Sequence, residues 1–399
     1  MGDLSPSVPS PAERPPLELS VVIPCLNEAD TLATCIRKAQ RAMREHEIAG
    51  EIVVADNDST DGTQAIAIQA GARLVHVEAR GYGHALMAGI AQARGRFVLM
   101  GDGDDSYDFL EIPAFVAKLR EGAELVQGCR LPSGGGRIAP GAMPFSHRWL
   151  GNPLFSLLAR LWFHAPVHDV YCGLRAFRKE LFERLNQRCT GMEFATEMIV
   201  QASLRGARIA EIPVTLHPDG RRSRKPHLRT LRDGWRTLRF LLLYSPMWLF
   251  LAPGAALILL GLAGYAIALP GLALRGIAFD AHTLLFASLA LLCGYQAILF
   301  SIFTKTYAIQ EGLLPPDRRL DRFFELVNLE RGLLVSAAAI IVGGALLLGA
   351  VDQWRLAGFG RLDYAVTMRL VVPGATLFAL GFQTALSSFF VSILGMGRR

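Results

Sequence analysis

Four long stretches without a charged residue dominate the second half of the sequence. They cover Phe240–Leu274, Ala281–Thr304, Gly332–Val351 and Leu370–Gly397. Roughly 20 apolar residues cross the hydrocarbon core of a bilayer as a helix, so each stretch is long enough for one span. The first stretch is too long for one straight span, and we expect Pro246 to break it. The chain is therefore predicted to be an integral membrane protein with four transmembrane helices.

The composition indicates that the first half of the chain is of a different kind. Hydrophobic residues make up 51% of the chain and charged residues 19%, below the roughly 25% charged residues typical of soluble domains. The apolar excess lies after Phe240, whereas the chain up to Asp219 has ordinary polarity. This composition excludes a disordered chain and a disulfide-dense secreted scaffold. The six cysteines have no C-x-x-C spacing, which favours free thiols in a reducing compartment.

Basic residues predict which side of the membrane each segment faces. From Arg221 onward the chain has 19 Lys and Arg against 9 Asp and Glu. Eight of these basic residues lie in 221–239 and five in 305–331, whereas the other two loops have one and three. We therefore expect the first domain, the second loop and the C-terminus to face the cytoplasm. A basic excess confined to the membrane half argues for membrane lipid as a partner and against nucleic acid.

We expect four segments along the chain. Residues 1–16 contain five prolines and no apolar signal-peptide core, so they are expected to form a disordered tail. Residues 17–225 are expected to form an α/β domain, 226–245 a juxtamembrane amphipathic helix, and 246–399 the membrane domain. The helix is predicted from leucines and a tryptophan at three-to-four spacing beside a parallel stripe of arginines. These residues are Leu228, Leu231, Trp235, Leu238 and Leu242, with Arg229, Arg232, Arg236 and Arg239. A plain basic flank of the first span is the alternative.

Short apolar strands alternate with helical patterns in the first domain. The expected strands are Leu19–Ile23, Ile52–Ala55, Leu74–Val77 and Phe97–Met100, and the expected helices are Glu28–Met43, Gly62–Ala70 and His84–Ala93. Continuous apolar strands separated by helices predict a mostly parallel sheet covered on both faces. Ligands of such sheets bind beyond the carboxyl ends of the strands. Polar residues follow three of these strands, which is the first indication of a functional site.

An Asp-Gly-Asp sequence at residues 102–104 follows the predicted strand Phe97–Met100. Two carboxylates one residue apart can present oxygens to Mg²⁺, which prefers a few carboxylates together with phosphate oxygens. Asp-Gly is also ordinary turn chemistry. Because the pair follows a buried strand beside two other acidic strand ends, we expect Asp102 and Asp104 to bind Mg²⁺ or Mn²⁺.

Several motifs together resemble a known enzyme family. VVIPCLNE (21–28), DNDSTDGT (56–63) and GDGDD (101–105), in this order, are similar to family 2 glycosyltransferases with the GT-A fold. The resemblance covers about residues 17–225. With membrane helices following, the chain resembles polyprenyl-phosphate glycosyltransferases of the dolichol-phosphate mannose or glucose synthase type. The resemblance implies an α/β GT-A domain that binds a nucleotide-sugar and transfers the sugar, with inversion, to a lipid phosphate.

The resemblance also implies roles for single residues on the donor side. Pro24, Leu26 and Glu28 would line the nucleotide pocket, with Gly83 in a loop near it. Asp56 and Asn57 would read the base, although the family often has a second aspartate where Asn57 stands. Asp102 and Asp104 match the family's metal and diphosphate motif. Ser106 stands where the family often has glutamine, and its hydroxyl can approach a metal or a metal-bound water.

The acceptor side needs cations that hold a phosphate in line with the reacting carbon. Arginine binds phosphate through two nitrogens at once, so Arg130, Arg148, Arg222 and Lys225 are candidates. Arg130 and the tract Arg221–Lys225 match basic positions of the family, whereas a solvated or lipid-facing charge is the alternative for Arg148. Asp169 and Arg175 are expected to brace this side, and Glu197 either does likewise or pairs with a basic partner.

We therefore predict a metal-dependent glycosyltransferase that moves a hexose from a nucleotide-sugar, with UDP-glucose as the expected donor, to a polyprenyl phosphate. A processive polysaccharide synthase is one alternative, although the Q-x-x-R-W pattern expected of that family is missing after the basic tract. A subunit that only binds nucleotide-sugar for a membrane transporter is another. The uncharged spans argue against a polar transport path. Small residues such as Gly343, Gly344 and Gly349 allow a homo-oligomer through the membrane helices.

Overall fold

The computed structural model describes residues 17–221, 230–274 and 277–396 of the chain. Contacts divide the protein into two compact units, Met1–Leu241 and Leu242–Arg399. The expected N-terminal tail and two of the candidate phosphate ligands, Arg222 and Lys225, lie outside the described residues. Each unit is described separately below.

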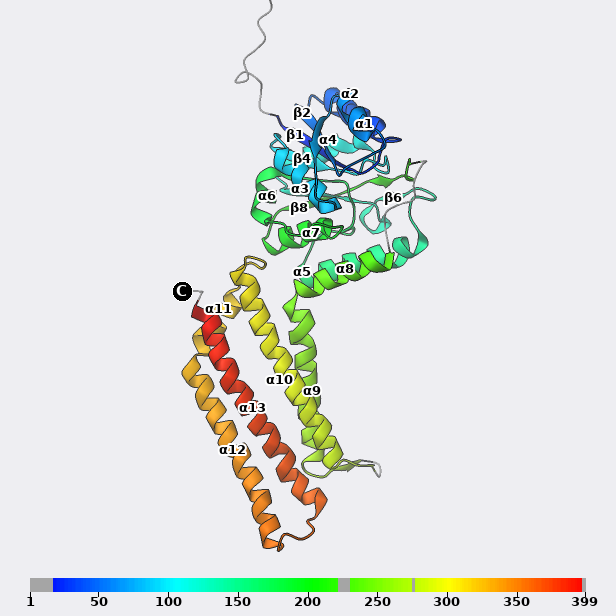
Figure 1. The fold of residues 1–399 in the computed structure, drawn as a ribbon. Helices are drawn as coiled ribbons and strands as arrows, with labels where there is room; N and C mark the ends of the chain where they lie inside the picture. The colour runs from blue at the N-terminus through cyan, green and yellow to red at the C-terminus, as the bar shows by residue number, and fades with distance from the viewer. Residues whose placement is uncertain (1–16, 222–229, 275–276, 397–399) are drawn as a thin grey trace, which may run out of the picture. The chain divides into compact units, whose positions relative to one another are not determined.

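A seven-stranded sheet forms the centre of the first unit (Figure 1). Its strand order is β3-β2-β1-β4-β7-β5-β8, and only β7 runs antiparallel to its neighbours. The strands are β1 (Leu19–Cys25), β2 (Gly50–Asp56), β3 (Arg73–His76), β4 (Phe97–Met100), β5 (Leu125–Cys129), β7 (Arg175–Arg178) and β8 (Ile209–Pro213). The predicted GT-A-like α/β class with a mostly parallel sheet is confirmed.

Helices cover both faces of the sheet. Successive strand residues point to opposite faces, so each strand contributes side chains to two buried clusters. Val21 and Ile23 belong to one buried cluster, whereas Val22 belongs to the other. The first cluster includes residues of α1 (Leu32–Glu45), α2 (Thr63–Gln69) and α4 (Ile112–Arg120). The second includes residues of α3 (Tyr82–Gln92), α5 (Asn152–Phe163), α6 (Lys179–Leu185) and α7 (Phe194–Leu204). This arrangement leaves the carboxyl edge of β1, β2 and β4 for the polar loops.

The first strand continues past its expected end at Ile23 and runs through Pro24 to Cys25. Pro24 lies inside β1, opposite Ala55 of β2. Pairing of β1 with β4 ends at Val22, whose carbonyl accepts a hydrogen bond from the Gly101 N–H. The missing N–H of residue 24 would point to that same side, beyond the end of β4, so the proline removes no ladder hydrogen bond.

Short elements connect the sheet to the end of the unit. They are η2 (Phe109–Glu111), η3 (Pro132–Gly134), β6 (Arg137–Ile138), η4 (His147–Gly151), β9 (Thr215–Leu216) and α8 (Thr230–Leu243). Strand β6 pairs in parallel with β9. Along α8, Trp235 and Arg239 are exposed, whereas Leu241 is buried. Two residues of the predicted interfacial pattern, Leu228 and Arg229, lie outside the described residues.

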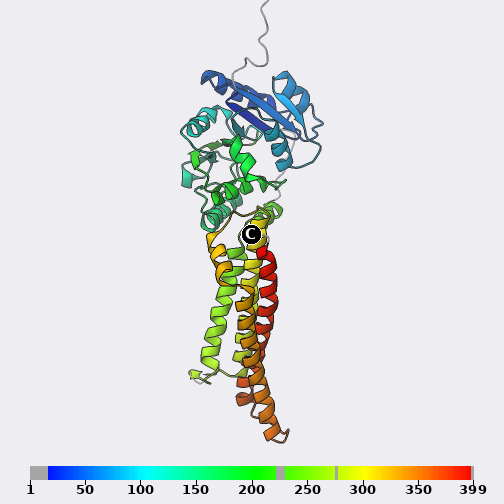
Figure 2. The same ribbon diagram turned by 90° about the vertical axis from the view of Figure 1, so that its left-hand side faces the viewer.

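Among its described residues, the second unit contains four helices that are long and apolar enough to cross a membrane, as the sequence predicts (Figure 2). The candidate spans are Met247–Ala268, Ala281–Gln310, Leu329–Leu356 and Tyr364–Met396. They correspond to η5 (Met247–Leu251) with α9 (Ala252–Ala268), α10 (Ala281–Gln310), α12 (Leu329–Leu356) and α13 (Tyr364–Met396). A hairpin of β10 (Ala273–Leu274) and β11 (Ile277–Ala278) follows α9, and α11 (Arg318–Leu326) precedes α12. Helix α8 ends at Leu243, so the chain breaks before Pro246 as predicted.

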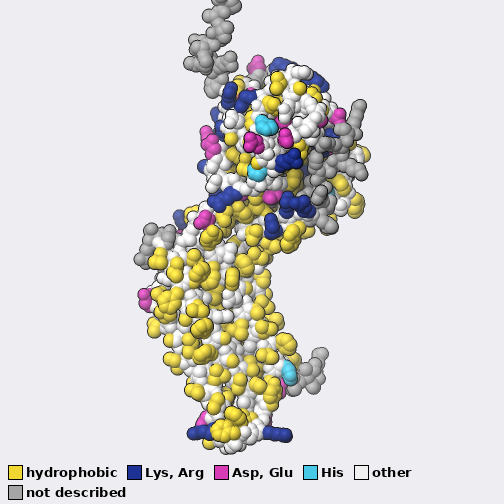
Figure 3. All heavy atoms as spheres, in the orientation of Figure 1, with side chains coloured by type: hydrophobic (Ala, Val, Ile, Leu, Met, Phe, Trp, Pro, Cys, Tyr) yellow, Lys and Arg dark blue, Asp and Glu magenta, His cyan; other side chains and the backbone are white. Residues whose placement is uncertain are grey.

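Small residues let the long helices approach one another within this unit. A β-carbon at Gly254 would lie 2.9 Å from the Gly294 carbonyl oxygen, and one at Gly343 would lie 2.7 Å from that of Gly374. Gly343 therefore packs against α13 of the same chain, whereas β-carbons at Gly344 and Gly349 would meet open space among the described residues. Hydrophobic side chains cover most of the visible surface of this unit (Figure 3), as expected of lipid-facing helices. The homo-oligomer remains a prediction.

Candidate functional site

The two aspartates of the Asp-Gly-Asp sequence lie at the carboxyl edge of the sheet, directly after β4. Tyr82, at the start of α3, donates its hydroxyl to Asp102 Oδ1 over 3.0 Å. Ser106 donates both its hydroxyl, over 2.6 Å, and its backbone N–H, over 3.1 Å, to Asp104 Oδ1. Each carboxylate is thus oriented through one oxygen. Ser106 contacts Asp104 itself, so the structure gives its hydroxyl the role of positioning that carboxylate.

An arginine that follows β9 joins three acidic residues at this edge. Arg221 is 9% exposed, and it pairs with Asp219 through Nε and Nη2, the latter 2.5 Å from Oδ2. Its Nη1 lies 3.0 Å from Glu28 Oε1, and its Nη2 lies 3.3 Å from Asp104 Oδ2. The loops after β1, β4 and β9 therefore meet at one guanidinium. In the sequence this arginine is recognisable only as part of a basic tract.

The positive charge of Arg221 does not neutralise the carboxylates around it. Burial, together with the nearby Asp104, raises the pKa of Asp102 to about 6. Burial also raises the pKa of Glu28 to about 8, against the lowering effect of Arg221. Although burial opposes its charge, contacts with Asp219, Glu28 and Asp104 raise the pKa of Arg221. A site with excess negative charge stabilises a further cation.

The donor set of this edge fits a divalent cation that shares its ligands with a phosphate. Within residues 17–221, 230–274 and 277–396, no three His, Cys, Asp or Glu side chains are arranged as a complete metal site. Mg²⁺ and similar ions, however, are commonly held by one or two carboxylates and complete their shell with water and substrate phosphates. Glu28 Oε2 is buried here without a hydrogen-bond partner. This orphaned oxygen beside two repelling aspartates is consistent with a missing positive charge.

The predicted base-reading pair separates into two roles. Asp56, fully buried at the end of β2, accepts hydrogen bonds at Oδ2 from Ser59 and Gln64, while its Oδ1 is buried without a partner. Asn57 donates its amide to the carbonyls of Val77 and Ala79 and accepts from the Gly81 N–H. The side chain of Asn57 is therefore engaged in hydrogen bonds with the loop before α3. Asp56, in contrast, keeps one carboxylate oxygen without a hydrogen-bond partner.

The loop after β1 is held in place by the DNDSTDGT motif. Asn27 has a left-handed φ of 61°, and its Oδ1 accepts a hydrogen bond from the Thr60 N–H over 2.8 Å. The Glu28 N–H donates to Thr63 Oγ1 over 2.8 Å. Pro24 is buried within β1 and Leu26 is half-buried beside this loop. The two motifs therefore form one rigid wall at the carboxyl edge.

Gly83 has a packing role that the sequence did not reveal. It is the second residue of α3, and its N–H donates to the Thr190 carbonyl over 3.0 Å. A β-carbon at Gly83 would lie 2.6 Å from the Cys189 carbonyl oxygen. The predicted loop is thus the first turn of a helix that presses against residues 189–190. Tyr82, its neighbour, is the residue that reaches Asp102.

Arg130 is engaged inside the domain. Its Nε and Nη2 contact the two oxygens of the fully buried Asp169 over 2.7 and 2.9 Å, and its Nη1 lies 3.3 Å from the Tyr107 hydroxyl. The same hydroxyl accepts the Gly173 N–H over 2.9 Å. Most of the predicted phosphate-binding capacity of Arg130 is therefore used to fix Asp169 and Tyr107. Three of its five N–H groups make these contacts, and one hydrogen on Nη1 and one on Nη2 are not used by them.

Arg175 and Glu197, the other residues expected on the acceptor side, form hydrogen bonds with backbone groups. The fully buried Arg175 donates to the carbonyls of Ala195 and Cys172 over 2.5 and 2.8 Å, and burial lowers its pKa. Glu197, at the start of α7, accepts the backbone N–H groups of Arg188 and Cys189. Both residues fix the loops behind the acidic edge.

Arg148 lies in a different environment. Its guanidinium carbon is 5.3 Å from the centre of the Trp149 ring, and its Nε is buried without a hydrogen-bond partner. The surrounding side chains form an exposed apolar stripe along η4 and α5. Its members are Phe145, Trp149, Leu150, Leu154, Leu157 and Leu161, each at least 42% exposed. The three-to-four spacing of the leucines is the sequence pattern that indicates this stripe, which was not among the predicted features.

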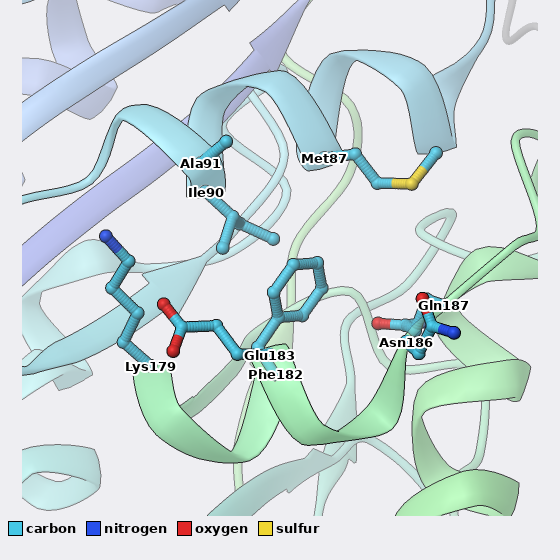
Figure 4. A pocket seen from close by; sticks show the side chains of 8 residues that line it. All are labelled: Met87, Ile90, Ala91, Lys179, Phe182, Glu183, Asn186 and Gln187. Carbon is cyan, nitrogen blue, oxygen red and sulfur yellow. The ribbon is translucent and has the colours of Figure 1, made fainter.

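A hollow of about 380 Å³ lies elsewhere, between α3 and α6 (Figure 4). Met87, Ile90 and Phe182 line it together with polar residues of α6. Lys179 at its rim donates to the Ala93 carbonyl over 2.7 Å. None of the predicted site residues lines this hollow, and we assign it no role in the site.

Comparisons with known proteins agree with both units. The family described as glycosyl transferase family 2 matches residues 20–185, and the one described as the glycosyltransferase family 2 C-terminal transmembrane region matches residues 302–395. The low-salt glycan biosynthesis hexosyltransferase Agl6 of Haloferax volcanii is 36% identical, over 94% of this chain and 89% of that protein. The dolichyl-phosphate hexose transferase of the same organism is 31% identical, over 49% of this chain and 82% of its own length.

Among solved structures, glucosyl-3-phosphoglycerate synthase from Mycobacterium tuberculosis, in complex with Mn²⁺, uridine diphosphate and its product, is similar to the first unit. The sequences are 24% identical, the match covers 57% of this chain and 78% of that chain, and the TM-score is 0.44.

Proposed function

The chain belongs to glycosyltransferase family 2, and we propose that it transfers a hexose from a nucleotide-sugar to a polyprenyl phosphate. The observation that carries this proposal is the acidic edge: Asp102 and Asp104 follow β4, and Asp56, which has one unpartnered carboxylate oxygen, ends β2 at the carboxyl edge of the same parallel strands. Support also comes from the names of two relatives, a hexosyltransferase aligned over 94% of this chain and a dolichyl-phosphate hexose transferase. UDP-glucose remains the donor we expect.

On the donor side, each residue of the acidic edge has a distinct task. Asp102 and Asp104 would hold Mg²⁺ or Mn²⁺, and this ion would neutralise the charge that develops on the departing nucleoside diphosphate. Tyr82 and Ser106 fix the directions of the two carboxylates. Asp56 Oδ1 accepts a hydrogen bond from the base. These groups are fixed before substrate arrives, so little reorganisation is needed when the donor bond breaks.

On the acceptor side, the lipid phosphate is already an anionic nucleophile near neutral pH. It needs no general base, but it needs cations that align it with the anomeric carbon. Arg221 lies at the acidic edge, and Arg222 and Lys225, which follow in the same tract, are proposed to contact the acceptor phosphate. Arg130 braces this side through Asp169.

The exposed stripe along η4 and α5 supports a lipid acceptor. A row of leucines with Trp149 and Phe145 is typical of a helix that lies in the membrane interface. Helix α5 also adjoins α8, since a β-carbon at Gly234 would lie 3.9 Å from the Phe155 ring. Only residues 244–246 connect α8 to the first span. We therefore propose that this side of the domain faces the cytoplasmic surface of the membrane.

The proposal is tested with the full-length protein purified in detergent. Labelled UDP- and GDP-sugars are mixed with undecaprenyl or dolichyl phosphate and Mg²⁺ or Mn²⁺, and the lipid extract is analysed. The expected product is one sugar on each lipid phosphate. A growing polymer would instead identify a processive synthase. Nucleotide-sugar binding without turnover would leave a binding subunit.

A further inference from the structure

We propose that Arg221 is a built-in counter-cation of the acidic edge, which occupies Asp104 until a divalent cation arrives and then moves to phosphate. The inference rests on the proposed function, because it takes Asp102 and Asp104 as the cation site. It adds a competition between this arginine and the metal, and an order in which ligands bind. The contacts of one guanidinium with Asp219, Glu28 and Asp104 carry it.

Arg221 contacts three carboxylates, those of Asp219, Glu28 and Asp104. Its contacts with Asp219 are close and double, at 2.9 Å from Nε to Oδ1 and 2.5 Å from Nη2 to Oδ2. The contact with Asp104 is longer, at 3.3 Å. Because Ser106 already occupies Asp104 Oδ1, Arg221 contacts the other oxygen of that carboxylate. Oδ2 is therefore the Asp104 oxygen available to a cation. The contact that Arg221 makes with this oxygen is longer than its contacts with Asp219.

A guanidinium and a divalent cation compete for this oxygen, because their positive charges repel each other. The Arg221 side chain is 9% exposed and the Asp104 side chain is 16% exposed. Solvent therefore only weakly screens the interactions between charges at this position. Like charges a few ångströms apart repel strongly in such a place. Arrival of the cation therefore displaces Arg221 from Asp104, while Asp219 remains as its partner.

The backbone keeps Arg221 near the site after this displacement. The His217 N–H donates to the Ser106 carbonyl and the Gly220 N–H donates to the Asp104 carbonyl, each over 2.9 Å. The segment before Arg221 is thus hydrogen-bonded to the loop that carries the aspartates. A released guanidinium stays within side-chain reach of phosphates bound at that loop, and its two-nitrogen geometry suits phosphate oxygens.

This exchange makes cation and nucleotide binding cooperative. A cation alone must displace Arg221 without providing it a new anion, so it binds weakly. Mn²⁺ together with a diphosphate supplies both the replacement charge at Asp104 and a new partner for Arg221. By linkage, each then raises the affinity of the other. The cation is therefore expected to release Arg221 from Asp104 first, and the diphosphate is expected to bind the released guanidinium.

The test measures Mn²⁺ binding to the full-length protein in detergent, from the electron paramagnetic resonance signal of free Mn²⁺. Arg221→Gln removes the charge, and Arg41→Gln is the matched control because Arg41 is an exposed arginine of α1 paired with Glu45. Arg221→Gln is expected to bind Mn²⁺ alone at least about tenfold more tightly than wild type. In saturating Mn²⁺ the same variant is expected to bind UDP about tenfold more weakly. Arg41→Gln changes neither.

A second measurement needs no variant and so does not depend on folding of Arg221→Gln. Phenylglyoxal modification of Arg221 in the wild-type protein is followed by mass spectrometry. Mn²⁺ alone is expected to increase modification, and Mn²⁺ with UDP to reduce it again. If the extent of Arg221 modification is the same with and without Mn²⁺, the inference is overturned.

The outcomes separate this inference from the proposed function. Equal Mn²⁺ affinity in wild type and Arg221→Gln, with binding lost in Asp104→Asn, would sink the inference and leave the cation site standing. Mn²⁺ binding that is undetectable in all variants, with or without UDP, would overturn both.

Discussion

Asp169 holds Arg130 through two parallel hydrogen bonds, from Nε to Oδ2 over 2.7 Å and from Nη2 to Oδ1 over 2.9 Å. Both residues are buried, and the Arg130 backbone N–H donates to the same carboxylate over 3.0 Å. Asp169 raises the pKa of Arg130 further despite the opposing effect of burial. The pair connects the end of β5 to the loop before β7.

Breaking this pair should destabilise the first unit. Asp169→Asn leaves a buried guanidinium without its counter-charge, which costs about 3–5 kcal/mol. Thermal unfolding of the purified protein should therefore shift to a markedly lower temperature. The matched control is Glu45→Gln, which breaks the exposed Arg41–Glu45 pair and should cost about 1 kcal/mol or less. Equal shifts in the two variants would contradict this account of the pair.

Gly173 should be required because of its contact with Asp102. A β-carbon at Gly173 would lie 2.6 Å from Asp102 Oδ2. Gly173→Ala is therefore expected to displace that carboxylate and to lower sugar transfer by about tenfold or more. Gly151→Ala is the control, since its nearest neighbour is an ordinary 3.7 Å contact. Wild-type transfer by Gly173→Ala would show that the position of Asp102 is unimportant.

The apolar stripe on α5 should act on the lipid substrate alone. Leu157→Glu places a charge where we expect lipid contact, and it should raise the KM for polyprenyl phosphate in vesicles about tenfold. UDP affinity should stay at the wild-type value. Ile68→Glu provides the control, because Ile68 is 61% exposed on α2. An unchanged KM for the lipid in Leu157→Glu would contradict the proposal that α5 contacts the membrane surface.

The stability of the first unit should depend on pH through Glu111. Burial raises the pKa of Glu111 to about 7, and its Oε2 has no hydrogen-bond partner. The folded state thus favours the protonated form, so its contribution to stability is full below about pH 4.5 and is lost as the pH rises through about 7. Glu111→Gln should therefore raise the unfolding temperature more at pH 8 than at pH 5.

Glu18→Gln supplies a control of opposite sign for this prediction. The hydrogen bond from Arg120 lowers the pKa of Glu18, so its contribution is present at neutral pH and is lost in acid. That variant should lower the unfolding temperature at pH 8 and have less effect at pH 4. An effect of Glu111→Gln that does not vary with pH would refute the assignment.

The sequence predicted the parts of this protein that depend on short-range patterns. Runs of apolar residues are enough to locate the four spans, and strand β4 lies where Phe97–Met100 was expected. The position of Asp102 and Asp104 at the sheet edge follows from the rule that parallel strands end together. The continuation of β1 through Pro24 was not predicted. Whether a strand tolerates this proline depends on where the neighbouring strand β4 ends, which the local sequence does not show.

The parts that could not be predicted depend on long-range contacts between side chains. Arg221 lies 117 residues from Asp104 in the sequence, and nothing in a basic tract shows which of its members turns toward an acidic loop. Asn57 is suitable for base recognition by residue type, but the structure spends its amide on Val77 and Ala79. Arg130 likewise could bind phosphate, yet the buried Asp169 takes most of its donors.

The central claim is that a cation at Asp102 and Asp104 allows the nucleoside diphosphate to leave while a lipid phosphate receives the sugar. The most direct measurement is transfer of labelled sugar into the lipid extract, compared in wild type and Asp104→Asn. We predict that chelation abolishes wild-type transfer, that Mg²⁺ or Mn²⁺ restores it, and that Asp104→Asn folds but transfers no sugar with any metal. Lipid labelling that survives complete chelation, or that equals wild type in Asp104→Asn, would contradict the account.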